Sequence, residues 1–255
     1  MTVTKGLLSK RIATFVSIME DIIHNLKIVH ERIEKTCRRV GRNPEEVRLL
    51  LATKTVQPDR IKIAIEAGER LIGENKVQEL KDKDAALAPL NIERHFIGHL
   101  QTNKIKDVVK YASCVQSLDR VEVAEQLDRR MQMLGRSMDV FIQINTSNEE
   151  SKFGIAPKEA VAFIKQVKQF QALKIKGLMT IGLLDADTEI MRPCLKLLRQ
   201  TRDIVLNEGI EGVDSLLLSM GMSHDIEIAI EEGSNIVRVG SAVFGNRIPG
   251  KEVWH

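Results

Sequence analysis

The sequence predicts an α/β fold in which eight parallel strands close into a single (β/α)8 TIM barrel with an extra N-terminal helix. Short apolar runs alternate with amphipathic segments along the 255 residues. Such alternation is typical of βαβ units and a parallel sheet. Eight strands, with no linker and no low-complexity segment, favour a closed barrel in one domain over residues 1–255. A doubly wound open sheet is the alternative.

The first helix is predicted from its apolar spacing. Ile18, Ile22, Leu26, Val29 and Ile33 recur at helical intervals, and Gly41 supplies a left-handed stop. We therefore expect a long amphipathic helix over residues 16–40, preceded by a flexible arm over residues 1–15.

The remaining elements follow in strict alternation. Strands are expected at residues 47–52, 70–72, 95–97, 114–117, 140–144, 175–179, 216–218 and 236–239. Each is a short apolar run bounded by turn residues, as buried strands are. Helices are expected from Pro58 to Gly68 and at residues 76–87, 104–111, 120–134, 157–170, 188–207 and 225–232.

The composition excludes several classes of function. The 38 Lys and Arg residues nearly balance the 35 Asp and Glu residues, and aromatic residues make up 4% of the chain. Nucleic-acid binding is therefore not expected. Three widely spaced cysteines predict neither a disulfide framework nor a metal site, and no apolar run approaches the roughly 18 residues of a membrane span. We expect a cytoplasmic protein without a membrane segment.

Polar residues follow several of the strands directly, where the carboxyl ends of barrel strands form the ligand mouth. Lys54 comes after an apolar run, so strand alternation can place its side chain inside the barrel. A lysine with a pKa lowered by burial is suited to attack a carbonyl. The alternative is a rim lysine that is solvated or paired with Glu74.

The loops after strands seven and eight contain the parts of a phosphate site. Gly221 and Gly240 permit close backbone approach, and Ser223 and Ser241 offer hydroxyl groups. The alternative is turn chemistry without a ligand, in which Ser223 caps the helix that begins near Asp225.

Two further polar positions lie at strand ends. Arg238 can point toward the mouth, or it can form a structural ion pair with Glu231 or Glu232. His95 and His99 flank a strand end, so they do not share a helical face as metal ligands often do, and no metal is expected. His99 can line the mouth or be an ordinary hydrogen-bonded histidine.

Beyond these local patterns, the sequence resembles the pyridoxal phosphate homeostasis family. The resemblance is carried by LLATKT from Leu50, GENKVQEL from Gly73, HFIGHLQTNK from His95, SMGMSHD from Ser219 and RVGSAVFGNR from Arg238. These motifs stand in the family's order over about residues 22–247. The family is similar to the N-terminal barrel of alanine racemases, and its members bind pyridoxal 5′-phosphate in the cytosol without an established catalytic activity.

The resemblance implies a set of cofactor-binding residues. Lys54 would hold the cofactor as a Schiff base, and Arg238 would face the pyridine nitrogen. Ser223, Gly240 and Ser241 would hold the phosphate. Asn75 would lie beside the cofactor, with Met220 and His99 as further neighbours in the pocket. An arginine at the pyridine nitrogen weakens the ring as an electron sink, which disfavours demanding carbanion chemistry. Lys76 stands where the family usually has tyrosine.

The resemblance leaves a carrier and an enzyme to be weighed. An alanine racemase takes its second base, a tyrosine, from a separate C-terminal domain, for which this chain has no room after the barrel. Its one tyrosine, Tyr111, is expected away from the mouth. We therefore expect a cofactor-binding homeostasis protein that is a monomer or weak dimer, with the apo-forms of pyridoxal-phosphate enzymes as partners. A weak racemase-type enzyme and a Schiff-base aldolase are the alternatives.

Overall fold

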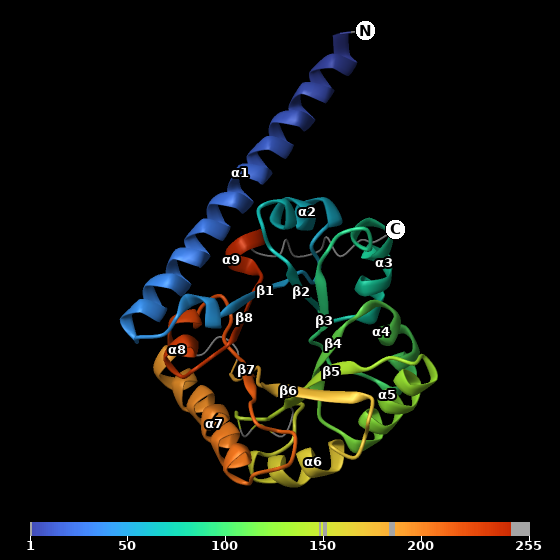
Figure 1. Cartoon of the computed structure of the whole chain (residues 1–255). Coiled ribbons are helices and arrows are strands. Elements are labelled where there is room, and N and C mark those ends of the chain that lie inside the picture. Colours follow the sequence, from blue (N-terminus) through green and yellow to red (C-terminus); the bar gives the residue numbers. More distant parts are fainter. Residues whose placement is uncertain (1, 148, 150–151, 184–186, 246–255) are drawn as a thin grey trace.

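The computed structural model describes residues 2–147, 149, 152–183 and 187–245, with side chains from Val16 onward except at positions 188 and 189. In this part of the chain, eight parallel strands form a closed barrel in the order β1 to β8. Helices surround the barrel on its outer side (Figure 1). The predicted (β/α)8 barrel is confirmed, and the open sheet is excluded.

The strands lie within about two residues of their predicted positions in most cases. They are β1 Arg48–Ala52, β2 Leu71–Glu74, β3 Glu93–Phe96, β4 Cys114–Leu118, β5 Met138–Gln143, β6 Leu173–Met179, β7 Leu217–Ser219 and β8 Ile236–Val239. Pairing of β1 with β8 aligns Leu50 with Arg238 and closes the barrel. Because all strands are parallel, their carboxyl ends meet at one mouth.

The helices also follow the predicted alternation. They are α1 Thr2–Arg39, α2 Pro58–Glu66, α3 Val77–Leu87, α4 Ile105–Tyr111, α5 Val121–Met133, α6 Ala160–Val167, α7 Thr188–Asn207, α8 Ile226–Glu231 and α9 Ser241–Phe244. Short 3-10 turns lie at η1 Pro44–Glu46, η2 Thr102–Lys104 and η3 Pro157–Glu159. Helix α1 begins well before the predicted Val16, since no proline interrupts residues 2–15. The short α9 and the 3-10 turns were not predicted.

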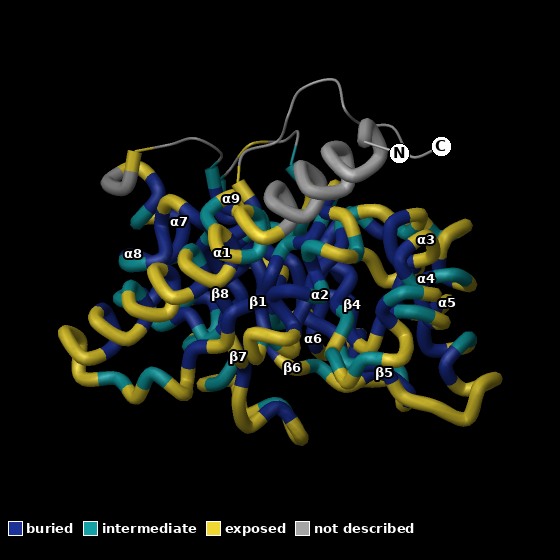
Figure 2. Tube along the Cα trace, turned by 90° about the horizontal axis from the view of Figure 1, so that it is seen from above, coloured by how far each residue is buried: buried dark blue, intermediate teal, exposed yellow. Residues whose placement is uncertain are grey.

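The core has two parts, which Figure 2 shows as buried segments in the middle of the molecule. The larger part lies between the strands and the helices, where α1 contributes Ile22, Leu26, Val29 and Ile33. The smaller part fills the barrel with seven buried apolar residues: Leu50, Leu71, Ile97, Cys114, Phe141, Met179 and Ile236. None of them comes from β7, whose contribution to the interior is polar and belongs to the site described below.

No helix in the described part of the chain is long and apolar enough to cross a membrane.

Candidate functional site

The residues predicted at the ligand mouth lie at the ends of four strands that are neighbours around the barrel. Lys54 follows β1, Asn75 follows β2, Ser223 lies in the loop after β7, and Gly240 follows β8. The barrel order places β7, β8, β1 and β2 side by side. Residues far apart in the sequence therefore occupy one side of one mouth.

The two loops predicted to hold phosphate contact each other directly. Ser241 Oγ lies 3.2 Å from Ser223 Oγ, and the N–H of Ala242 donates to Ser223 Oγ over 3.3 Å. Ser223 is buried, whereas Ser241 is exposed. The alternative role of Ser223 as a helix cap is wrong: α8 has Asp225 at its N-cap, and the Ser223 hydroxyl is turned toward the loop after β8.

The glycines of these loops stand where a side chain does not fit. A Cβ on Gly240 would lie 2.9 Å from the carbonyl oxygen of Ala52, because the loop after β8 crosses close to β1. Gly221 has a φ of +93°, and its Cβ would lie 2.4 Å from that of Ala229. Both positions bring backbone close to backbone or core, which leaves main-chain groups unshielded by side chains.

Arg238 lies inside the barrel and is 6% exposed. Its Nη1 donates to Ser219 Oγ over 2.9 Å, and its Nη2 donates to the carbonyl of Thr180 over 2.6 Å. Burial lowers its pKa to about 10, and the nearby Asp225 carboxyl opposes that decrease. The alternative ion pair with Glu231 or Glu232 is wrong.

Those two glutamates face the outer helices. Glu231 bonds with Arg39 and Arg192, and Glu232 bonds with Arg192 and Arg199. They lie at the end of α8 and just after it, on the outside of the barrel. Strand alternation in β8, with a side chain on each face in turn, instead directs Arg238 to the interior.

A chain of polar contacts continues from Arg238 across the barrel. Ser219 Oγ donates to Gln116 Oε1 over 2.6 Å, and Gln116 Nε2 lies 2.8 Å from His95 Nδ1. Ser219 and Gln116 are fully buried, and burial lowers the pKa of His95. The three side chains hold the guanidinium of Arg238 in one orientation, because each hydrogen bond constrains the next.

Lys54 is half-buried, and its backbone is held by a buried charged cluster that the sequence analysis missed. Lys83 Nζ donates to the carbonyl of Thr53 over 2.8 Å, and the N–H of Thr55 donates to Glu79 Oε2 over 3.1 Å. Thr55 has a φ of +63°, which is uncommon for a residue with a side chain. The backbone on both sides of Lys54 is thereby fixed.

The same cluster contains Glu74, which lies in the sequence directly before Asn75. Lys83 Nζ lies 2.7 Å from Glu74 Oε1 and 3.3 Å from Glu79 Oε2, and Thr53 Oγ1 donates to Glu74 over 2.6 Å. Burial raises the pKa of Glu74 to about 8, and the nearby Glu79 adds to this rise. The pKa of Glu79 is lowered by hydrogen bonding and by the charge of Lys83, despite its burial.

Asn75 and His99 present polar atoms without partners among the described residues. Asn75 Oδ1 and His99 Nδ1 are both buried and make no hydrogen bond. Gly98 packs tightly beside them, since its Cβ would lie 2.0 Å from the carbonyl oxygen of Asn75. The His99 ring stacks on Phe153, with 3.6 Å between ring centroids. A buried polar atom that lacks a partner marks a place where a ligand or a water can bind.

The remaining predicted positions are placed less centrally. Ser219 points into the barrel, and the next residue, Met220, points the other way. The Met220 side chain is fully buried in the larger part of the core, between the barrel and the helices. Lys76, which stands in the place of the family's usual tyrosine, is exposed at the N-cap of α3. The structure therefore groups Lys54, Asn75, Ser223, Arg238, Gly240 and Ser241 around one mouth and leaves Met220 in the core.

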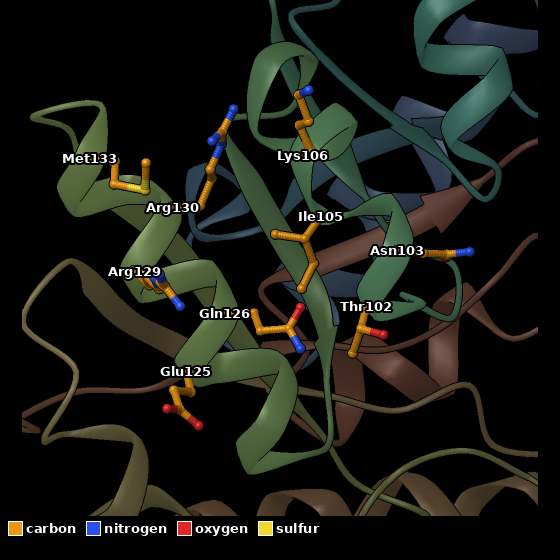
Figure 3. A pocket seen from close by; sticks show the side chains of 9 residues that line it. All are labelled: Thr102, Asn103, Ile105, Lys106, Glu125, Gln126, Arg129, Arg130 and Met133. Carbon is orange, nitrogen blue, oxygen red and sulfur yellow. The ribbon is translucent and has the colours of Figure 1, made fainter.

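A surface groove lies elsewhere, between η2 and α4 on one side and α5 on the other (Figure 3). It is lined by residues of η2, α4 and α5, including Lys106, Arg129 and Arg130. None of the predicted cofactor residues lines this groove, so it is separate from the candidate site.

The chain was compared with known proteins. Residues 22–248 match the family model described as "Alanine racemase, N-terminal domain". The pyridoxal phosphate homeostasis protein of Aquifex aeolicus is 41% identical over 87% of this chain and 96% of that protein. The chain belongs to the pyridoxal phosphate homeostasis protein family. The family member from Escherichia coli K12 is 38% identical over 90% of this chain and 98% of its own.

Solved structures agree with membership of the pyridoxal phosphate homeostasis protein family. PipY from Synechococcus elongatus, described as having pyridoxal phosphate bound, has a TM-score of 0.74 at 31% identity and covers 84% of this chain and 100% of its own. An alanine racemase from Clostridium difficile has a TM-score of 0.71 at 14% identity, over 92% of this chain and 59% of the racemase. The racemase likeness shows a shared barrel fold.

Proposed function

We propose that this chain binds pyridoxal 5′-phosphate through a Schiff base on Lys54 and acts in the homeostasis of that cofactor. The observation that carries the proposal is the arrangement of polar groups at three neighbouring strands, β7, β8 and β1. Lys54 and buried Arg238 lie there beside the two serine loops, which are the contacting segments that carry Ser223 and Ser241. The bound state of PipY supports it, because PipY is a relative at 31% identity over 84% of this chain.

The donors and acceptors among the described residues suit the chemistry of this cofactor. Ser223, Ser241 and the backbone at Gly240 offer hydroxyl and main-chain donors for phosphate oxygens. Arg238 would face the pyridine nitrogen, and Asn75 Oδ1 is a buried acceptor that has no partner among the described residues. Lys54 would hold the cofactor through its amine, which is the group that can condense with an aldehyde. The cofactor supplies the aldehyde that is stored and released.

The site favours a carrier over an enzyme. Arg238 presents only donors to its partner, so the pyridine nitrogen stays unprotonated and the ring withdraws electrons weakly. The sole tyrosine of the chain, Tyr111, ends α4 and precedes β4, at the face of the barrel opposite the mouth. We therefore propose that no amino-acid turnover of physiological size occurs at this site.

We place this function in the cytoplasm, with apo-forms of pyridoxal-phosphate enzymes as recipients and with a monomer or weak dimer as the working unit. The cysteines Cys37, Cys114 and Cys194 are buried free thiols. Buried unpaired thiols suit a reducing compartment, in which disulfides rarely persist.

The test of the Schiff base is the visible spectrum of the purified protein after incubation with pyridoxal 5′-phosphate. Borohydride reduction followed by peptide mass analysis then locates the adduct. We expect a visible band that reduction removes, with the adduct on Lys54. The variant Lys54→Ala loses the band, whereas the control Lys76→Ala, an exposed lysine of the neighbouring loop, keeps it. A reduced adduct on any other lysine would overturn the assignment.

The carrier is distinguished from the enzyme by exchange of the α-hydrogen of amino acids in deuterated water. We expect no exchange above that of free pyridoxal 5′-phosphate for the loaded protein with any of the common amino acids. Exchange that is faster than this and is lost in Lys54→Ala would establish the enzyme alternative.

A further inference from the structure

Helix α1 runs along the outside of the barrel against α8 and α9, the segments that follow the two serine loops (Figure 1). Ile22, Val29 and Ile33 on its inner face are buried in the core. Two polar residues of the same helix reach the serine segments: Arg32 contacts the loop that carries Ser223, and Asn25 contacts α9, which begins at Ser241. They are seven residues apart, which is close to two helical turns, so they project from the same side of α1.

Arg32 contacts the loop that carries Ser223. Its Nη1 donates to the carbonyl oxygen of Ser223 over 3.0 Å. Its Nε and Nη2 donate to the two carboxylate oxygens of Glu227, each over 2.7 Å. Glu227 lies in the first turn of α8, so one guanidinium holds both the loop and the helix that follows it. Such a two-pronged pair fixes geometry as well as adding attraction.

Asn25 contacts α9, the short helix that begins at Ser241. Its Nδ2 donates to the carbonyl oxygen of Val243 over 3.1 Å. Val243 directly follows Ala242, whose N–H donates to Ser223 Oγ. Asn25 and Arg32 therefore hold the two segments whose mutual contact forms the serine pair, and both bind a main-chain carbonyl of their segment.

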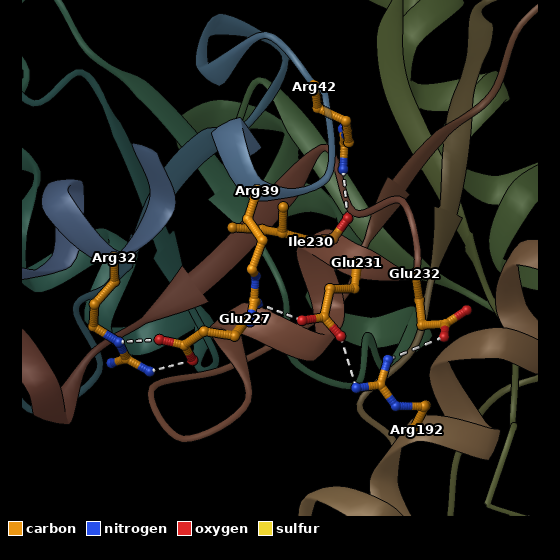
Figure 4. A network of polar contacts seen from close by, with 8 residues as sticks. All are labelled: Arg32, Arg39, Arg42, Arg192, Glu227, Ile230, Glu231 and Glu232. Atoms are coloured by element: carbon orange, nitrogen blue, oxygen red, sulfur yellow. Dashed lines mark hydrogen bonds and ion pairs between the residues drawn. The ribbon is translucent and has the colours of Figure 1, made fainter. Parts of the chain in front are cut away.

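The other polar contacts of this face lie farther along α1, or just after it, and do not reach the loops. Arg39 pairs with Glu231, and Arg42 Nη1 donates to the carbonyl of Ile230 over 2.9 Å. Arg192 of α7 joins Glu231 from the other side, as Figure 4 shows. These contacts attach α1 to the end of α8 without touching the segment around Ser223.

We propose that Arg32 and Asn25 are positioning residues that set the spacing of the two serine loops and thereby the tightness with which the chain holds a phosphate monoester. This inference rests on the proposed function and adds a role for α1 within it. When α1 holds the two serine loops in place, they do not have to become ordered on binding phosphate, which lowers the free-energy cost of binding. Without the contacts of Arg32 and Asn25, the two loops would no longer be held at this distance from each other.

The experiment compares two aldehydes, pyridoxal 5′-phosphate and pyridoxal, which has no phosphate group. Binding to the full chain is followed by the visible band, for the unchanged protein and for Arg32→Ala, Asn25→Ala and Arg39→Ala. Arg39→Ala is the matched control, because it removes an ion pair between α1 and α8 that does not touch the serine loops. Thermal unfolding of each variant shows whether the barrel remains intact.

We expect Arg32→Ala to weaken binding of pyridoxal 5′-phosphate about tenfold, which corresponds to about 1.4 kcal/mol, and to leave binding of pyridoxal unchanged. Asn25→Ala shows the same selectivity and serves as the test if Arg32→Ala does not fold. Equal loss for both aldehydes, or an equal loss in Arg39→Ala, would overturn the proposal. Failure of the unchanged protein to bind either aldehyde at Lys54 would instead overturn the proposed function.

Discussion

Replacing Lys83 with methionine should destabilise the barrel strongly and loosen the backbone at Lys54. Lys83 is 1% exposed, and its Nζ contacts Thr53, Glu74 and Glu79 at 2.8, 2.7 and 3.3 Å. Methionine fills a similar volume but removes the charge, so the Glu79 carboxylate is left buried without its cation. Breaking a buried ion pair in this way costs about 3–5 kcal/mol.

That cost is a large part of the roughly 5–15 kcal/mol by which domains are stable. The assay is equilibrium unfolding in urea, with the free energy extrapolated to water. The control is Lys81→Met, an exposed lysine on the same helix, for which a change within about 0.5 kcal/mol is expected. The double variant Lys83→Met with Glu79→Gln should recover part of the loss, because it removes the stranded carboxylate. A loss below about 1 kcal/mol in Lys83→Met would refute the reasoning.

Three further predictions concern the same site. Burial raises the pKa of Glu74 from 4.5 to about 8, so between these pH values the folded state keeps a proton that the unfolded state releases. The contribution of Glu74 to stability is therefore lost as the pH rises through this range. Glu74→Gln should flatten the resulting decline in the free energy of unfolding from pH 5 to 8, and an unchanged slope would contradict this. Gly221→Ala should cost more stability than Gly209→Ala. Both glycines have a positive φ, but only at Gly221 would an added Cβ lie 2.4 Å from a neighbouring side chain. Equal unfolding midpoints would argue against the packing described. Ser219→Ala should cost about 1–3 kcal/mol of stability, because it leaves the buried groups of Gln116 and Arg238 without their partner. Ser117→Ala should cost less, because the buried Ser117 hydroxyl has no partner among the described residues. Calorimetry that ranks the two variants the other way would count against the polar chain across the barrel.

The strand and helix order was predictable because it depends on local patterns. Each strand is a short apolar run, and a parallel barrel buries such runs on both faces, so the runs and the turn residues that bound them locate the strands. The start of α1 at Thr2 was missed because residues 2–15 have weaker apolar periodicity, although they lack proline.

The partners of the site residues were harder to predict because they are distant in the sequence. Arg238 bonds to Thr180, 58 residues away, and to Ser219, 19 residues away. Nothing local to Arg238 distinguishes that outcome from an ion pair with the nearby Glu231. Sequence motifs indicated the candidate residues, and the barrel register determined which of them face inward.

The buried cluster behind Lys54 was missed although a signal was present. Leu80, Lys83 and Leu87 recur at helical spacing and share the buried face of α3. A lysine on an apolar stripe is unusual unless it is paired. Glu79, four residues before Lys83, was the partner to look for.

The contacts of α1 also bear on when the protein becomes competent during its synthesis. Arg32 meets a residue 191 positions later in the chain, and Asn25 meets one 218 positions later. Contacts between such distant segments form late and slow folding. A nascent chain that has left the ribosome up to β6 already exposes Lys54 but lacks the loops that bind α1. The proposed binding of a phosphorylated aldehyde therefore becomes possible only when the two ends of the barrel join, after β8 and α9 have been made.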